Sequence, residues 1–110
     1  MLSKTNIQEI ANKVAECFSP EKIILFGSYA RGDVHDNSDL DLLVVMNSEA
    51  PLGKRSAPII KMLAEHYAEP IDVIVRSSKS LTKWKDTPGS FAHQVFSEGI
   101  VLYDEQEQSA

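Results

Sequence analysis

Two aspartates separated by one residue, Asp39 and Asp41, open an apolar run that is typical of a β-strand. Side chains alternate across a strand, so both carboxylates project from one face, with α-carbons about 6.6 Å apart, while Leu40 and Leu42 face the other way. Metal pairs in phosphoryl-transfer sites lie about 3.5–4 Å apart, and Mg²⁺ holds oxygen ligands at about 2.0–2.1 Å. Two carboxylates at this spacing can therefore straddle such a pair.

A third acid, Asp72, interrupts the apolar run 71–75. If this strand pairs beside the strand that Asp39 opens, the three carboxylates form one cluster. Two carboxylates about 6 Å apart repel by roughly 3 kcal/mol at an effective dielectric constant near 20, and a divalent cation removes that repulsion. The alternative interpretation of Asp72 is a charge on an edge strand that discourages aggregation.

Gly27 and Ser28 follow the apolar run 22–26 directly. A glycine at a strand end lets the backbone approach a ligand closely, and the amides of a following helical turn, with the Ser28 hydroxyl, point donors at an anion. Arg31 lies one helical turn further on and adds positive charge near the same anion. Taken alone, a Gly-Ser pair is usually a turn and an Asp-x-Asp a solvated strand entrance. Their joint order favours a phosphate-binding and metal-binding site.

The elements that must position these residues are those of one α/β domain, a small mixed β-sheet flanked by helices. A capping box at Thr5 and Gln8 favours a helix over 5–18, and Asp36-Asn37-Ser38 favours a turn before Asp39. Apolar periodicity and turn residues predict further helices from near residue 58 to before residue 70 and over 91–97, and strands over 22–26, 39–46, 71–75 and 100–103. Residues 78–88 show no clear pattern. Residues 105–110 are expected to form a flexible C-terminal tail, so the domain spans 1–104.

Composition and charge narrow the function classes. The 110 residues carry a formal net charge of −5, which is the wrong sign for a protein that grips free nucleic acid. The longest apolar run is the five residues 42–46, against about 20 for a membrane span, so no membrane partner is expected. The single cysteine and the lack of a secretory signal pattern favour the cytoplasm.

The segments 27–33 and 38–45, Gly-Ser-Tyr-Ala-Arg-Gly-Asp and Ser-Asp-Leu-Asp-Leu-Leu-Val-Val, resemble the signature of the DNA polymerase beta-like nucleotidyltransferase superfamily. The ten residues between Ser28 and Asp39 resemble the spacing in its small prokaryotic branch, the minimal nucleotidyltransferases. The resemblance implies a polymerase beta-like core in which Gly27 and Ser28 hold a nucleoside triphosphate, with ATP as the family's default substrate. It also implies that Asp39 and Asp41 coordinate two Mg²⁺ ions, and that Asp72 binds the catalytic metal and helps to activate the attacking hydroxyl.

The resemblance also implies a partner. Members of this branch are often encoded with a small helical HEPN-type ribonuclease toxin and act as antitoxins that transfer AMP to a tyrosine of it. The chain lacks the acceptor-binding domains of larger relatives, so the acceptor surface is expected from another chain or from a homodimer. Two alternatives remain open: a non-catalytic nucleotide-binding antitoxin that acts by occlusion, and an enzyme that modifies a small molecule such as an antibiotic. For the latter, 110 residues leave little material for an acceptor pocket.

Overall fold

Four strands form one mixed sheet in the computed structural model, which describes residues 2–35 and 38–108. The strand order is β3-β2-β1-β4, with β1 antiparallel to β2 and β4, and β2 parallel to β3. The strands span Lys22–Phe26 (β1), Leu40–Val45 (β2), Ile71–Arg76 (β3) and Ile100–Asp104 (β4). The expected α/β class and mixed sheet are confirmed. The predicted turn at Asp36-Asn37 lies outside the described residues.

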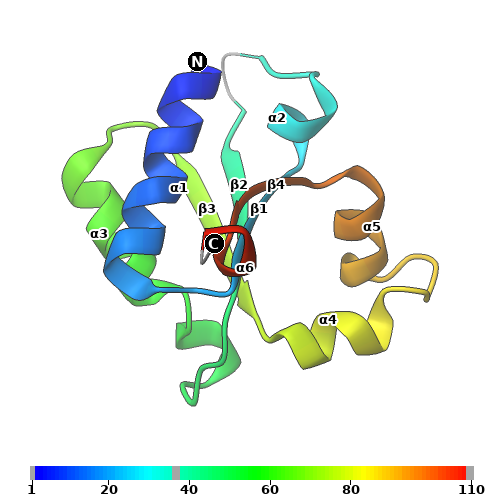
Figure 1. The fold of residues 1–110 in the computed structure, drawn as a ribbon. Coiled ribbons are helices and arrows are strands. Elements are labelled where there is room, and N and C mark those ends of the chain that lie inside the picture. The colour runs from blue at the N-terminus through cyan, green and yellow to red at the C-terminus, as the bar shows by residue number, and fades with distance from the viewer. Residues whose placement is uncertain (1, 36–37, 109–110) are drawn as a thin grey trace.

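Helices cover both faces of this sheet (Figure 1). On one face lie α1 (Lys4–Phe18) and α3 (Ala57–His66), and on the other lie α4 (Ser78–Trp84) and α5 (Phe91–Glu98). Three short elements complete the description: α2 (Ser28–Arg31), the 3-10 helix η1 (Leu52–Lys54) and α6 (Glu105–Gln108). None of the helices in the described ranges is long and apolar enough to cross a membrane.

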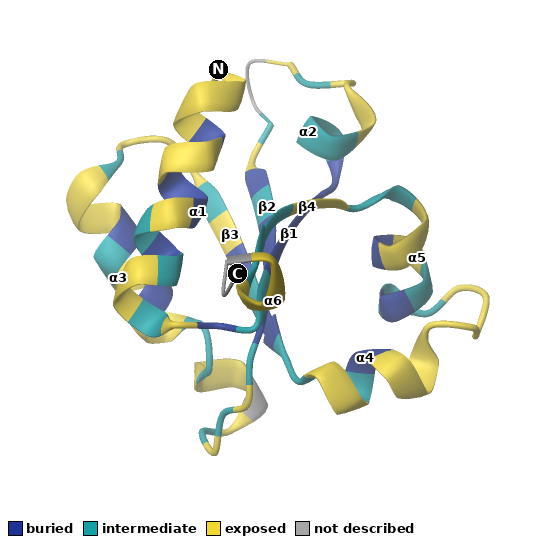
Figure 2. Ribbon diagram, viewed as in Figure 1, coloured by how far each residue is buried: buried dark blue, intermediate teal, exposed yellow. Residues whose placement is uncertain are grey.

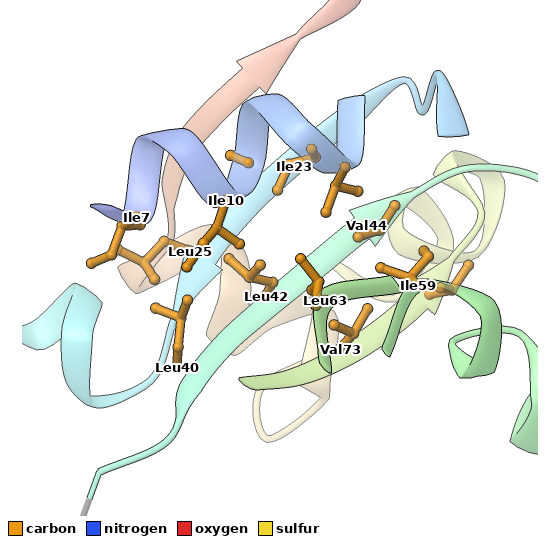
Figure 3. Packing of buried hydrophobic residues seen from close by; sticks show 13 residues of the cluster. Ile7, Ile10, Ile23, Leu25, Leu40, Leu42, Val44, Ile59, Leu63 and Val73 are labelled. Carbon is orange, nitrogen blue, oxygen red and sulfur yellow. The ribbon is translucent and has the colours of Figure 1, made fainter. Parts of the chain in front are cut away.

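The core has two layers because the central strands are buried on both sides. Along β2, Leu40, Leu42 and Val44 pack with α1 and α3, whereas Leu43 and Val45 pack with α4 and α5. The burial pattern follows this division, with buried residues on the sides of the helices that face the sheet (Figure 2). Figure 3 shows the first layer, in which side chains of α1 and α3 meet those of β1, β2 and β3. A strand covered on both faces is expected to be nearly all apolar, and Asp41 is the exception in β2.

The start of α1 differs from the prediction. Ser3, not Thr5, caps the helix: the Asn6 amide donates to Ser3 Oγ, and the Ser3 amide donates to Asn6 Oδ1. A serine and an asparagine three residues apart thus form the capping box, two residues earlier than the predicted box at Thr5 and Gln8.

Two further segments are more ordered than the pattern indicated. Residues 78–84, which showed no periodicity, form α4, because the Ser77 hydroxyl accepts a hydrogen bond from the Ser80 amide and Leu81 is buried against the sheet. Four residues of the expected tail, 105–108, form α6, and the Gln106 amide donates to Asp104 Oδ1. The residues of α4 show no helical pattern in the sequence because the helix has only seven residues and only one of them, Leu81, is buried.

Neighbouring isoleucines on α3 provide a matched test of the core. Ile59 is 1% exposed and Ile60 is 38% exposed. Ile59→Ala should lower the free energy of unfolding by about 2–5 kcal/mol, because it removes buried apolar volume. Ile60→Ala should lower it by no more than about 1 kcal/mol. Urea titration followed by circular dichroism measures both, and equal losses would contradict the described orientation of α3.

Candidate active site

Asp41 and Asp72 lie opposite each other on neighbouring strands. The parallel register of β2 and β3 pairs Asp41 with Asp72, and the antiparallel register on the other side of β2 pairs Asp41 with Phe26, the last residue of β1. Paired residues share a face of the sheet, here the face that α4 and α5 cover. The acids and the turn after β1 therefore meet at one end of the sheet, as the sequence predicts.

Asp39 lies one residue before β2 and is exposed. Just before it, the Ser38 hydroxyl accepts a hydrogen bond from the His35 amide, and the Ser38 amide donates to His35 O. At the next residue, the Leu40 amide donates to Pro70 O and joins the starts of β2 and β3. Asp39 is thus held beside the pair, although outside the strand.

Asp41 is influenced electrostatically by the other two carboxylates. Partial burial raises the pKa of Asp41 above its usual value, and the charges of Asp72 and then Asp39 raise it further, while Arg31 opposes the rise. Like charges disfavour the ionised form of a carboxyl, and a bound cation reverses that preference. The arrangement therefore favours a cation at this end of the sheet.

Gly27 lies directly against the carboxylate of Asp41. Its φ is +75°, in the region that favours glycine, and a Cβ placed on it would overlap Asp41 Oδ2. The sequence predicts that Gly27 allows close approach to a ligand. The structure adds that the group already in close approach is a carboxylate of the acid cluster.

Gly27 also begins α2, the short turn that carries Ser28. The Ala30 and Arg31 amides donate to Gly27 O, and the Gly32 amide donates to Ser28 O. The first amides of a helical turn have no acceptor within the turn, so those of Ser28 and Tyr29 can donate to a ligand. The Tyr29 hydroxyl accepts a hydrogen bond from the Leu2 amide and so links α2 to the start of α1. Donors for an anion and carboxylates for a cation thus lie side by side.

Arg31 is engaged with protein carboxylates. Its Nε donates to Asp33 Oδ2 at 3.2 Å, and its Nη1 donates to Glu98 Oε1 at 3.3 Å. These contacts, chiefly the one with Asp33, raise the pKa of Arg31. Sequence reasoning identified Arg31 but missed Glu98, which lies 67 residues further along the chain and carries no local signal of this contact.

The donor set suits Mg²⁺, because Asp39, Asp41 and Asp72 offer carboxylate oxygens, the ligands that this cation prefers. Within the described residues, no three His, Cys, Asp or Glu side chains are grouped closely enough to hold one metal ion. Burial and the charges of Asp72 and Asp39 raise the pKa of Asp41, and a cation beside it would offset those charges. The assignment of these three residues as metal ligands remains a prediction.

One hollow among the described residues, with a volume of about 190 Å³, does not include the acid cluster. That hollow is lined by Lys22 and Val45, at the ends of β1 and β2 that lie away from Phe26 and Asp41, and by Leu81 and Phe96. A deep acceptor pocket would favour a small-molecule acceptor. Because this hollow and the acids lie at opposite ends of the strands, the hollow gives no support to a small-molecule acceptor.

Comparisons with known proteins point to one family. Residues 6–108 match the family described as Polymerase beta, Nucleotidyltransferase. Over 86 residues, 76% of this chain and 78% of the relative, the sequence is 38% identical to a candidate protein adenylyltransferase of Methanocaldococcus jannaschii. A second candidate protein adenylyltransferase of that organism is 42% identical over 55 residues, half of this chain, and the match spans 54% of the relative's length.

A solved structure agrees with these relatives. The fold is similar to that of a chain in a crystal structure of a toxin-antitoxin with AMP-PNP, with a TM-score of 0.62 and 25% sequence identity. The match covers 92% of this chain and 76% of that chain. The likeness extends over nearly all the elements that position the acids and the Gly-Ser turn.

The raised pKa of Asp41 predicts a dependence of stability on pH. Between the ordinary aspartate pKa of 3.8 and the raised value, the folded protein binds more protons than the unfolded chain, so stability falls as pH rises through this range. Asp41→Asn removes this titration. Its melting temperature relative to wild type should therefore be higher at about pH 7 than at about pH 3, as measured by calorimetry.

Asp86→Asn, at an exposed aspartate between α4 and α5, controls for the change in net charge. A lower relative melting temperature of Asp41→Asn at neutral pH would contradict the electrostatic account of the cluster.

Three glycines test the contact between Gly27 and Asp41. Gly27→Ala places a methyl group in a positive-φ position and against Asp41, Gly32→Ala meets a positive φ alone, and Gly53→Ala meets neither constraint. We expect Gly32→Ala to lose about 1–2 kcal/mol of stability, Gly27→Ala to lose more, and Gly53→Ala to change by less than about 1 kcal/mol. Urea unfolding measures all three, and equal losses at Gly27 and Gly32 would argue against the contact.

Proposed function

The chain belongs to the polymerase beta nucleotidyltransferase family, in its minimal nucleotidyltransferase branch, and on that premise we propose that it is a Mg²⁺-dependent enzyme that transfers AMP from ATP to a hydroxyl of a partner protein. The observation that carries the proposal is the contact between Gly27, at the start of the Gly-Ser turn, and Asp41, in register with Asp72. This contact places anion donors beside paired carboxylates, and nucleotidyl transfer requires both.

Each residue then has a role that follows from its position. Gly27 and Ser28 bind the triphosphate through the first amides of α2 and the Ser28 hydroxyl. Asp39, Asp41 and Asp72 hold two Mg²⁺ ions, which when bound neutralise the charge on the phosphate oxygens. Arg31 adds positive charge beside the triphosphate.

The transfer itself is an in-line displacement. The oxygen of the acceptor hydroxyl attacks the α-phosphorus of ATP and forms a new P–O bond, and the bond from the α-phosphorus to the pyrophosphate oxygen breaks. Asp72 is exposed on the edge strand β3 and accepts the proton of the attacking hydroxyl. Its position on an edge strand also matches the alternative role of an edge charge. The activity of an Asp72 variant separates the two roles.

A protein acceptor is supported by the relatives and by the open position of the acids. The two Methanocaldococcus jannaschii relatives are named for candidate protein adenylyltransferase activity, and the structural neighbour is a toxin-antitoxin with AMP-PNP. We infer that this chain is the antitoxin of such a pair, that its partner is a HEPN-type helical toxin, and that the modified hydroxyl belongs to that toxin. A site at an exposed end of the sheet is open to the side chain of a second protein.

The proposal is tested by the Asp41→Asn variant, with Asp86→Asn as the control of equal charge. After incubation with ATP, Mg²⁺ and the co-expressed partner, mass spectrometry of the partner should show added AMP for wild type and Asp86→Asn. Asp41→Asn should label at least about a hundredfold less while keeping its circular dichroism spectrum, because it loses the charged carboxylate that would hold the cation.

Undiminished labelling by Asp41→Asn would remove the catalytic assignment. The same variant separates chemistry from occlusion: if it protects cells from the partner as well as wild type does, binding alone accounts for protection.

A further inference from the structure

Arg31 is contacted on two sides by carboxylates that come from very different supports. Asp33 follows α2 in the chain, and its side chain is 61% exposed. Glu98 is the last residue of α5, and its side chain is 23% exposed. The contact with Glu98 therefore joins α2 to α5, which packs on the sheet. The contact with Asp33 stays within the segment that α2 belongs to.

Glu98 has a rigid support. Three residues earlier, Val95 is 1% exposed and packs in the core layer of α4 and α5. At the next residue, the Gly99 amide donates to Val95 O at 2.7 Å, and a Cβ on Gly99 would overlap that carbonyl oxygen. Gln94 Nε2 donates to the same Glu98 Oε1 that Arg31 contacts, at 3.2 Å. The backbone at Glu98 is thus held by the end of α5, and its carboxylate is held by Gln94, before it meets Arg31.

The contacts use only part of the guanidinium. Nε donates to Asp33 and Nη1 donates to Glu98, while Nη2 has no hydrogen-bond partner among the described residues. A guanidinium has five N–H donors in a rigid plane, so two fixed contacts set the direction of the rest. The charge of Arg31 also acts on Asp41, which places the guanidinium within electrostatic reach of the acid cluster.

We propose that Glu98 is a positioning residue for nucleotide binding: it holds Arg31 through Nη1 so that the remaining N–H groups of the guanidinium donate to a phosphate oxygen of the bound triphosphate. This inference rests on the proposed function, since it requires a triphosphate at the Gly-Ser turn. An arginine that is already ordered loses less side-chain entropy on binding than a free one. Without Glu98, Arg31 keeps only the contact with the more exposed Asp33.

The test measures the dissociation constant of Mg²⁺·AMP-PNP by isothermal titration calorimetry, which needs no acceptor. Glu98→Gln should bind about two- to fivefold more weakly than wild type, the range that corresponds to an exposed ion pair. Arg31→Ala should bind at least as weakly. In the double variant, the Glu98 change should add nothing to the Arg31 change, because Glu98 acts through Arg31.

Glu107→Gln, on the exposed α6, removes the same charge away from Arg31 and should bind like wild type. Melting temperatures of all variants separate loss of fold from loss of binding. Equal or tighter binding by Glu98→Gln, or a further loss in the double variant, would overturn the inference while leaving the proposed function in place. If wild type itself does not bind Mg²⁺·AMP-PNP, the proposed function fails and this inference fails with it.

Discussion

The contact between the Gly27 backbone and the Asp41 carboxylate is the constraint on which the site depends. Any side chain at Gly27 would push Asp41, the second residue of β2, away from the turn that follows β1. The antiparallel register, in which Phe26 pairs with Asp41, brings these segments together, and the positive φ of Gly27 turns the chain away into α2. One backbone position thus determines whether anion donors and cation ligands are neighbours or are separated by a side chain.

This contact lowers the stability of the fold, because it brings like charges together on a sheet whose buried side chains are apolar. Asp41 is partly buried beside two other carboxylates, and its raised pKa reflects that cost. The next pair inward in the register, Leu42 with Val73, is buried in the main core layer. At this end of the sheet, the strands therefore carry core side chains on one face and site side chains on the other, and the packed layers offset the repulsion between the acids.

The sequence predicts the features that depend on local pattern, and it misses those that depend on tertiary contact. All four strands follow from apolar runs, whereas the sequence placed Asp72 beside the other acids only on the condition that their strands pair, which the register of β2 and β3 now shows for Asp41 and Asp72. The cap at Ser3 was missed because Thr5 and Gln8 offer an equally good local pattern, and α4 was missed because a single buried residue, Leu81, anchors it. Glu98 gives no local signal, since its role depends on an ion pair with a residue 67 positions away.

The charges around Arg31 also bear on how a nucleotide enters the proposed site. Arg31 forms ion pairs with Asp33 and Glu98. The acid cluster contributes Asp39, Asp41 and Asp72, which form no ion pair among the described residues, and the charge of Arg31 offsets only part of their repulsion at Asp41. A free triphosphate would therefore meet net negative charge, which opposes its approach. A triphosphate that arrives with its Mg²⁺ brings the missing positive charge to the side of the turn where the carboxylates lie. Under the proposed function, the electrostatics of the site thus favour binding of the metal and the nucleotide as one unit, and the role that we propose for Arg31 is to orient the phosphates.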